Sequence, residues 1–222
     1  IDDTVDVVHG HQQLSLFNAH YDERCFLPIH VYDTATGRPV AMILRPGKTP
    51  SGVEVRGHLR RLVRRIRHHW STTKITIRGD GHYCRPEVMD WCEAHGVDYV
   101  FGLARNPRLV GAIAAELALA KSEAEQTGKA ARRFKDFRYQ TLDSWSCARR
   151  VVGKAEQLAE GGDPPSANPR FVVTSLSAAA WAPKPLYEQL YCARGEMENR
   201  IKECQLDLFA DRTSTRTMRA NQ

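Results

Sequence analysis

The sequence predicts an α/β fold in which helices pack against a mixed β-sheet. Three observations lead to this class: apolar stretches joined by a turn near the start, an amphipathic helical pattern after them, and short strand-like stretches that alternate with helical ones. The expected order is β-β-β-α-β-α-β, followed by a strand-rich segment and a final helix. Hairpins combined with a helical crossover require both antiparallel and parallel pairs in the sheet.

The first fifty residues predict three successive strands. We place one strand at the N-terminus around Asp2 and two more at residues 24–32 and 39–44, which are rich in β-branched and apolar residues. The stretch at residues 33–37 has turn composition, so it joins the last two strands as a hairpin. These strands begin the predicted sheet.

The next fifty residues predict two helices and two strands. Ser51 and Glu54 form a Ser-x-x-Glu capping box, and the apolar residues behind it recur at helical spacing with arginines on the other face. A short strand at residues 74–77 leads to Asp80. A second helix with a proline in its first turn then precedes a strand at residues 97–103.

The second half of the chain predicts a strand-rich segment and a final helix. An Ala/Glu-rich helix at residues 109–126 precedes a basic patch at 129–138. A Gly/Pro/Asp linker at residues 161–166 interrupts the strand-like stretches, and the pattern is helical again at residues 185–209. Strand-like stretches lie at residues 137–142, 145–152 and 171–176. We therefore expect a core made of residues 1–104 and 181–222 and an insertion at residues 105–180.

Composition bounds the class of protein without fixing its function. The 222 residues suffice for one large domain or a domain with an inserted module, and 32 Lys and Arg against 26 Asp and Glu give a net charge of +6. This surplus permits an anionic partner but does not establish one. The six cysteines lack Cys-x-x-Cys spacing, which argues against structural zinc and a disulfide framework and favours a reducing cytoplasm.

The sequence gives no indication of a membrane partner. Its apolar runs fall short of the roughly 20 residues that span a bilayer. The chain starts without an initiator Met, inside a predicted strand, and stops shortly after a predicted helix. We therefore expect it to be a fragment of a longer protein.

Three carboxylates stand where a strand or helix can present an acid to a common site. Asp2 lies on the first strand, Asp80 follows the fourth, and Glu198 lies in the final helix. Hard divalent cations such as Mg²⁺ take oxygen ligands, and phosphodiester chemistry commonly uses two such ions. Asp3 competes with Asp2, because successive strand side chains point to opposite faces. The alternative for Glu198 is a surface pair with Lys202.

With these residues in place, the chain resembles a DDE transposase of bacterial insertion sequences. The family carries its first Asp in an Asp-x-Thr context, here Asp2 to Thr4, which favours Asp2 over Asp3. Its second Asp follows the fourth strand, as Asp80 does. Its last acid lies in a Tyr-x2-Arg-x3-Glu-x6-Lys motif, which here reads Tyr191, Arg194, Glu198 and then Gln205 in place of the Lys.

The resemblance implies a ribonuclease-H-like core with a β-rich insertion before the last acid. It implies that Asp2, Asp80 and Glu198 are catalytic and bind two Mg²⁺ ions, with Mn²⁺ as a substitute. The implied activity is DNA cleavage at transposon ends and strand transfer into target DNA. The implied partner is double-stranded DNA, and a homo-oligomer assembled on it brings the two ends together. Such a protein acts in the bacterial cytoplasm, at the nucleoid.

DNA contacts are expected at five residues. Arg194 suits a phosphate because a planar guanidinium grips two oxygens, and Tyr191 has a hydroxyl for the same backbone. Lys202 lies one turn from the position where the family has its Lys. Arg138 and Trp145 belong to a patch in which aromatic residues interleave with cations, as in single-strand binding surfaces. Core packing of the insertion is the alternative for Trp145.

Two further sets of polar residues have more ordinary interpretations. His82, near Asp80, is interpreted as a local polar contact or a DNA contact and not as a metal ligand. An arginine run is interpreted as the solvated face of the first helix, with DNA binding as the alternative; it comprises Arg60, Arg61, Arg64, Arg65 and Arg67.

Two other functions compete with transposition. A phosphatase of the haloacid-dehalogenase type is suggested by the Gly79-Asp80-Gly81 sequence, but the acid that this family has shortly afterwards falls on Cys84 and Arg85. An inactive, DNA-binding transposon remnant is suggested by the missing start, the abrupt end and Gln205.

Overall fold

The structure is a computed structural model that describes residues 1–158 and 167–222. Within these ranges it describes every side chain except those of Arg194 and Glu196. The linker predicted at residues 161–166 lies outside the described residues. No helix in the described part of the chain is both long enough and apolar enough to cross a membrane.

The described chain forms two compact units. The terminal unit combines Ile1–Ser51 with Ala193–Gln222, and the central unit comprises Gly52–Cys192. Both ends of the chain therefore belong to one unit, while the middle of the chain forms the other.

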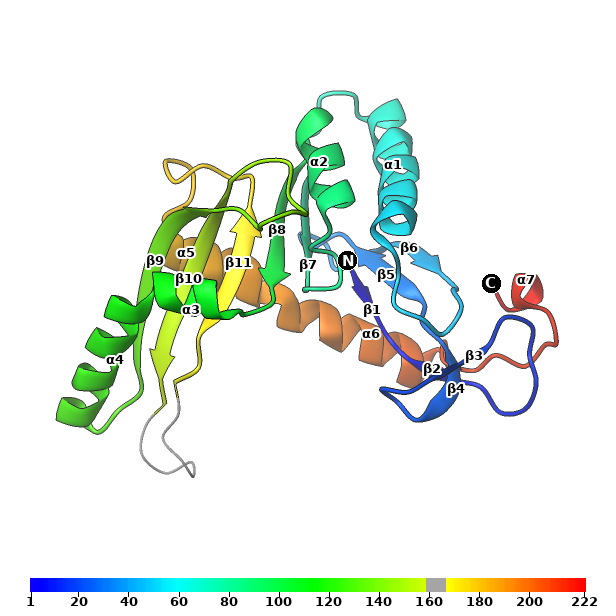
Figure 1. Ribbon diagram of the computed structural model, residues 1–222. Coiled ribbons are helices and arrows are strands. Elements are labelled where there is room, and N and C mark those ends of the chain that lie inside the picture. The colour runs from blue at the N-terminus through cyan, green and yellow to red at the C-terminus, as the bar shows by residue number, and fades with distance from the viewer. Residues whose placement is uncertain (159–166) are drawn as a thin grey trace. The chain divides into compact units, whose positions relative to one another are not determined.

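Two small antiparallel sheets build the terminal unit (Figure 1). Their strand orders are β1-β5-β6 and β2-β4-β3. The strands are β1 (Asp2–Asp3), β2 (Asp6–Val7), β3 (Leu16–Asn18), β4 (Glu23–Phe26), β5 (Ile29–Tyr32) and β6 (Pro39–Ile43). The hairpin predicted near residues 33–37 is confirmed by the antiparallel pairing of β5 with β6.

Helix α6 (Gly195–Asp207) belongs to the terminal unit and packs on the first of these sheets. Its apolar residues Met197 and Ile201 are buried with Tyr32 of β5, and Met42 of β6 packs against them. Residues four apart lie on the same helix face, so these two side chains fix which face of α6 meets the sheet. A short helix, α7 (Met218–Asn221), ends the chain.

A five-stranded mixed sheet forms the centre of the central unit, in the order β7-β8-β11-β10-β9. Strands β7 and β8 are parallel, whereas the other neighbours are antiparallel. The strands are β7 (Thr76–Gly79), β8 (Asp98–Leu103), β9 (Ala131–Tyr139), β10 (Arg149–Gln157) and β11 (Arg170–Thr174). The predicted mixed α/β class is confirmed.

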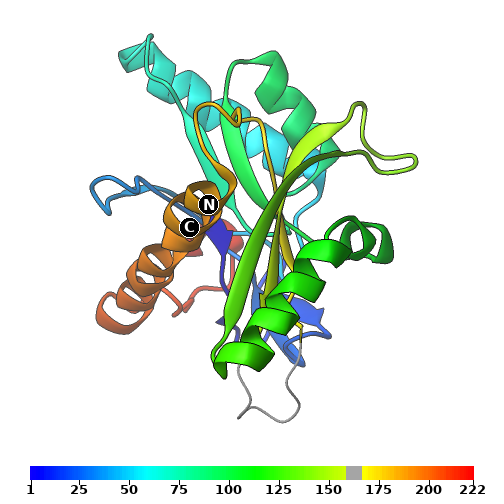
Figure 2. The ribbon, with the colours of Figure 1, turned by 90° about the vertical axis from the view of Figure 1, so that its left-hand side faces the viewer.

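Helices cover both faces of the outer part of this sheet. On one face, Val100, Val152 and Val172 pack against Leu186 and Tyr187 of a π-helical turn. On the other face, α4 (Ala114–Thr127) lies along β9 and β10 (Figures 1 and 2). Strands covered on both faces read as continuous apolar runs, which explains the valine-rich sequences of β10 and β11.

The helices of the central unit begin and end with recognisable signals. The first four of them are α1 (Gly52–His69), α2 (Pro86–Ala94), α3 (Pro107–Ala112) and α4 (Ala114–Thr127). Asn106 caps α3 by accepting a hydrogen bond from the Leu109 backbone N–H at 3.0 Å. Gly128 ends α4 in the left-handed conformation that glycine adopts readily. The helix predicted after Ser51 is α1, which buries its apolar stripe.

The arrangement of strands differs from the expected one. The strands expected to open a single sheet with β7 and β8 hydrogen-bond in sheets of their own. The strands expected to form a separate insertion instead extend the sheet of β7 and β8, because β11 pairs antiparallel with β8 along Val100 to Leu103. Short apolar strands give no signal of their partners, so this pairing was not predictable from sequence.

The helical stretch predicted at residues 185–209 is confirmed, because every residue from Pro183 to Asp207 is helical, but it is not a uniform α-helix. The structure has a short α-helical turn α5 (Pro183–Pro185), a π-helical turn η1 (Leu186–Tyr191), a 3₁₀ turn η2 (Cys192–Arg194) and then α6. Because the helical period changes before Gly195, the 3.6-residue spacing applies only within α6, which holds Glu198 and Gln205. Gly195, a poor helix former, begins the α-helical part.

Candidate functional site

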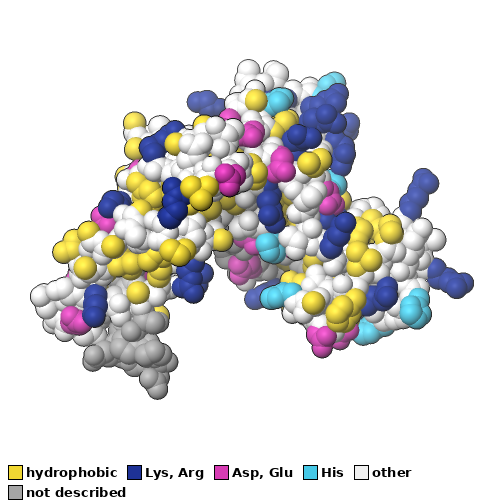
Figure 3. Space-filling view, viewed as in Figure 1, with side chains coloured by type: hydrophobic (Ala, Val, Ile, Leu, Met, Phe, Trp, Pro, Cys, Tyr) yellow, Lys and Arg dark blue, Asp and Glu magenta, His cyan; other side chains and the backbone are white. Residues whose placement is uncertain are grey.

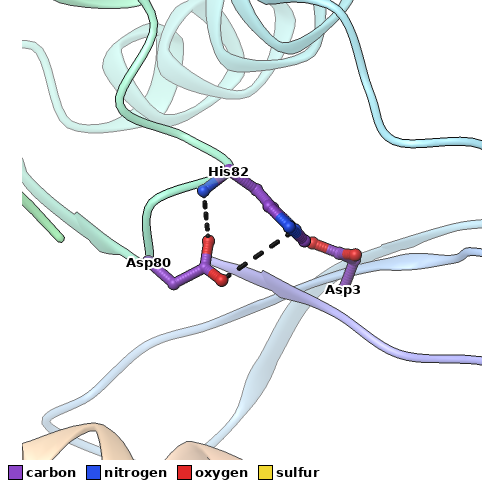
Figure 4. A group of neighbouring side chains, drawn as sticks. All are labelled: Asp3, Asp80 and His82. Carbon is purple, nitrogen blue, oxygen red and sulfur yellow. Dashed lines mark hydrogen bonds and ion pairs between the residues drawn. The ribbon is translucent and has the colours of Figure 1, made fainter. Parts of the chain in front are cut away.

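Asp80 lies at the carboxyl end of β7, in a tight turn that fixes its side chain. Its Oδ1 accepts a hydrogen bond from the backbone N–H of His82 at 2.8 Å, and the His82 Nδ1 lies 3.9 Å from Oδ2 (Figure 4). The following Tyr83 is fully buried and anchors the turn. The result is a carboxylate that is held at one oxygen and is still 26% exposed.

Tyr191 lies beside the Asp80 turn. A Cβ added to Gly102 on β8 would lie 2.5 Å from the Tyr191 hydroxyl, 3.1 Å from the backbone nitrogen of Gly81 and 3.3 Å from the carbonyl carbon of Asp80. All three groups therefore surround one point on β8 where a side chain would not fit. The structure brings two of the predicted site residues, Asp80 and Tyr191, to this point.

The π-helical turn η1 is tied to the strand that carries Asp80. Arg78 of β7 donates a hydrogen bond from Nη1 to the backbone oxygen of Leu190 at 2.8 Å. Leu186 and Tyr187 anchor the start of η1 in the core. π-helical turns are rare overall, but they occur often at functional sites. Tyr191 is the last residue of this turn, so the turn determines the position of Tyr191.

Asp2 and Asp3 lie on β1 of the terminal unit. Asp2 is 7% exposed and Asp3 is half-buried. The register pairs Asp2 with His30 and Asp3 with Ile29 of β5. Because paired residues of neighbouring strands share a face, the Asp2 and His30 side chains lie on the same side of the sheet.

His30 is a candidate site residue that the sequence did not reveal. It is buried and stacks on Tyr32 with ring centroids 6.3 Å apart. Burial lowers the pKa of its imidazole, so the ring is neutral near pH 7. Its Nδ1 has no hydrogen-bond partner among the described residues. The only sequence signal was its place in a predicted strand. The sequence does not show which residue of another strand pairs with Asp2.

Glu198 lies on α6, in the same unit as Asp2. It follows the buried Met197 in sequence and is itself exposed, as is Lys202 one turn later. Gln205 does not take the place of a DNA-binding cation, because its Nε2 donates a hydrogen bond to the Thr4 hydroxyl at 3.0 Å. This bond ties α6 to the chain just after the first acid.

Asp6 is a second buried acid that the sequence did not reveal. It is 2% exposed, and its Oδ1 has no hydrogen-bond partner among the described residues. Burial raises its pKa to about 7; a hydrogen bond with Gln205 opposes this shift, and the charge of Asp211 adds to it. Asp6 is therefore partly protonated near neutral pH, unlike an ordinary carboxyl group.

The remaining predicted DNA contacts lie in different surroundings. Trp145 is 6% exposed, with its ring edge-on to Tyr139 at 5.7 Å and under the Arg149 guanidinium at 5.5 Å. Burial favours the core-packing interpretation of Trp145 over base stacking. Arg138 is exposed and donates a hydrogen bond to the Ala148 carbonyl oxygen. The side chain of Arg194 lies outside the described structure.

The surroundings of Asp80 fit a hard divalent cation. No Lys or Arg side chain in the described part of the chain forms an ion pair with Asp80, and its contacts are the backbone and ring of His82. A partly exposed carboxylate with spare lone pairs is the ligand that Mg²⁺ takes, usually together with substrate phosphates. Asp80 therefore offers an oxygen ligand of the chemical type that metal-dependent phosphodiester cleavage requires.

Comparison with protein families gives a match over the entire chain. The family model described as transposase DDE domain group 1 matches residues 1–222. No curated protein matches the chain significantly. The family match gives no support to the phosphatase alternative suggested by the Gly79-Asp80-Gly81 sequence.

Proposed function

Because the chain belongs to the transposase DDE domain family, we propose that it cleaves DNA at transposon ends and joins the cut strand to target DNA. The observation that carries this proposal is the match over all 222 residues, which includes each of the three predicted acids. The exposed carboxylate of Asp80, with Tyr191 beside its turn, supports it from the geometry of the central unit.

Asp2, Asp80 and Glu198 are the proposed ligands of two Mg²⁺ ions, with Mn²⁺ as a substitute. Bound divalent cations supply the charge that activates a water or 3′-hydroxyl nucleophile and stabilises the leaving oxygen. Asp2 and Glu198 come from the terminal unit and Asp80 from the central unit. The proposal therefore requires residues of both units in the active enzyme. In this proposal the ribonuclease-H-like core comprises residues 1–104 and 181–222, and the insertion at residues 105–180 contributes β9, β10 and β11, which continue the sheet of β7 and β8.

The remaining site residues bind and orient DNA. Tyr191 donates its hydroxyl hydrogen to a phosphate oxygen near Asp80, and Arg194 and Lys202 bind the neighbouring backbone. Arg138 adds a phosphate contact on the central unit. Trp145 has an indirect role, because its buried ring supports the strand end that carries Arg149.

The proposed substrate also implies an assembly and a location. Two transposon ends must be held at once, which a homo-oligomer formed on double-stranded DNA achieves. The enzyme acts on the bacterial chromosome and therefore in the cytoplasm, at the nucleoid. The second candidate function is that of an inactive, DNA-binding remnant. Gln205 favours it, because this residue replaces the cation of the family motif and donates a hydrogen bond to Thr4.

Substitution of single acids tests the proposal. Asp2→Asn, Asp80→Asn and Glu198→Gln should each lower Mg²⁺-dependent cleavage of a duplex carrying the transposon end by at least about 100-fold, because a metal ligand accounts for several kcal/mol of transition-state stabilisation. Asp143→Asn is the control, since Asp143 is an exposed acid remote in sequence from all three. The readout is nicked product on a denaturing gel.

The parallel variant Asp3→Asn decides between the two neighbouring acids of β1. We expect Asp3→Asn to retain most of the cleavage that Asp2→Asn loses. Cleavage retained in Asp80→Asn would refute the proposed mechanism. DNA binding without cleavage by the unsubstituted chain would instead support the inactive remnant.

A further inference from the structure

We propose that the outward face of α1 is a docking surface for the phosphate backbone of double-stranded DNA. The choice of duplex DNA as the partner depends on the proposed function, whereas the surface itself is defined by the structure. Lys and Arg side chains gather over α1 (Figure 3). The outward face, as we define it, consists of the exposed residues Arg56, Arg60, Arg61, Arg64 and Arg65.

The cations of this face are not neutralised by the protein. Arg56, Arg60, Arg64 and Arg65 form no hydrogen bond or ion pair with any other residue that the structure describes, while Arg61 contacts a histidine. The only acid of α1 lies in its first turn. These guanidinium groups are therefore available to a partner that brings its own negative charge.

Arg67, on the same helix, has a structural role. Arg67 donates hydrogen bonds to the backbone oxygens of His95 at 2.7 Å and Gly96 at 2.8 Å, which ties the end of α1 to the end of α2. This arginine is half-buried. It is therefore excluded from the outward face, although it belongs to the same run in the sequence.

The spacing of the outward face places like charges next to one another. Arg56, Arg60 and Arg64 are four residues apart, as are Arg61 and Arg65. Like charges at this spacing destabilise a helix, whereas solvated helices usually mix both signs. Helix α4 follows the usual pattern with its Lys121–Glu125 pair at 3.8 Å. The run of positive charges on α1, without interspersed acids, is complementary to a partner that carries a regular array of negative charges.

The dimensions of the outward face fit a DNA strand. Eight residues separate Arg56 from Arg64, which corresponds to about 12 Å along a helix axis. One strand of B-DNA carries a phosphate about every 3.4 Å of its axis, so three to four phosphates lie within that length. The apolar residues Val55, Leu59 and Val63 are buried, so the helix is anchored by its other side. The arginines therefore face outward from a fixed support.

A membrane surface is a poorer partner for this face. Helices that bind lipid combine cations with a broad exposed apolar side, but the apolar stripe of α1 is buried in the protein core. Val53 and Trp70, the exposed apolar residues of this region, lie at the two ends of the helix. Charge complementarity alone, without apolar insertion, points to a phosphate backbone.

The salt dependence of DNA binding tests this surface. The logarithm of the binding constant falls with the logarithm of salt concentration by about 0.9 for each phosphate contact. The double variant Arg60→Gln/Arg64→Gln should therefore reduce the slope by about 2. Arg132→Gln/Arg133→Gln is the control, because it removes two exposed charges of β9 that are paired with Glu156 and Glu123. Its slope should remain that of the parent.

The measurement uses an Asp80→Asn background, so that DNA is bound without being cut, and a second double variant, Arg56→Gln/Arg65→Gln, in case the first misfolds. A parent that binds duplex DNA while both α1 variants keep its slope would overturn the surface and leave the proposed function intact. A parent that fails to bind duplex DNA would overturn both. Stronger binding of the parent to anionic lipid vesicles or to RNA of equal charge would also overturn the choice of partner.

Discussion

Two arginine-rich surfaces of the central unit differ in how their charges are used. Three of the four cations of β9 are paired with acids of neighbouring elements: Arg132 with Glu156, Arg133 with Glu123 at 2.6 Å, and Lys135 with Glu116 at 3.2 Å. Those of the outward face of α1 have no acidic partners among the described residues. Sequence favoured β9 as the DNA-binding surface because aromatic residues interleave with its charges. The structure shifts that preference to α1, since a paired cation has less charge to offer a phosphate.

The aromatic residues near β9 reinforce this difference. Phe134 packs against Tyr187 with ring centroids 5.7 Å apart, and Trp145 is buried against Tyr139. Aromatic rings used in the protein core are not platforms for nucleic-acid bases. The comparison teaches that composition alone does not separate a structural basic patch from a binding surface. The partner of each charge must be known.

Charge reversal should give the largest contrast between the two surfaces. Arg60→Glu/Arg64→Glu on α1 replaces two proposed phosphate contacts by repulsion, and we expect a loss of duplex DNA affinity of about 100-fold, or roughly 2.7 kcal/mol, at 0.1 M salt. Fluorescence anisotropy with a labelled duplex measures it. The same reversal of Lys135 and Arg133 on β9 should change the affinity less; an equal or greater loss there would break the comparison.

Removal of a buried acid should show that the charges of β9 serve stability. Glu156 is buried, and although burial alone raises its pKa, hydrogen bonds from Lys154 and Arg132 bring the pKa below its ordinary value. Glu156→Gln should therefore lower the free energy of unfolding by about 2 kcal/mol at pH 7, the scale of a charged hydrogen bond. Urea denaturation measures this loss.

The pH dependence of the Glu156 effect has a defined sign. A carboxyl group whose pKa is lowered by folding stabilises the folded state above its unfolded pKa and loses that contribution as the pH falls. The difference between the parent and Glu156→Gln should therefore shrink below about pH 4.5, near the ordinary pKa of glutamate. Glu125→Gln, which breaks an exposed pair with Lys121, should cost less than about 0.5 kcal/mol. A similar cost for both variants would contradict the structural role of the β9 charges.

Release of a paired cation should give the smallest effect. Glu123→Gln frees Arg133 from its ion pair on the exposed surface, so duplex DNA affinity should rise by about twofold, because such pairs contribute at most about 1 kcal/mol. Asp143→Asn makes the same change in net charge without freeing a known partner. A gain of the same size in both variants would mean that net charge, and not pairing, controls binding.

The sequence was sufficient for local structure and for the family. The capping signal at Ser51 and the apolar spacing behind it predicted α1, and turn residues predicted the β5–β6 hairpin. The predicted positions of Asp80 after a strand and Glu198 in a helix are also confirmed. Each of these features depends on residues close together in the chain, where spacing carries the information.

The features that sequence did not predict depend on contacts between distant segments. The register of Asp2 opposite His30 joins residues 28 apart in number, and Arg132 meets Glu156 across a strand pair. The π-helical turn before Tyr191 is stabilised by core packing and by a bond from Arg78. No local pattern encodes such partners. The sequence therefore indicated the candidate acids but not the groups that position them.

Site-specific crosslinking tests the central difference between the two surfaces most directly. A photoreactive phenylalanine placed at Arg60 of α1 or at Arg133 of β9 reports contact with a bound duplex independently of affinity. Both positions are exposed, and both replacements remove one positive charge. We predict covalent protein–DNA adducts from the Arg60 position and few from the Arg133 position. Adducts mainly from the Arg133 position would contradict the account.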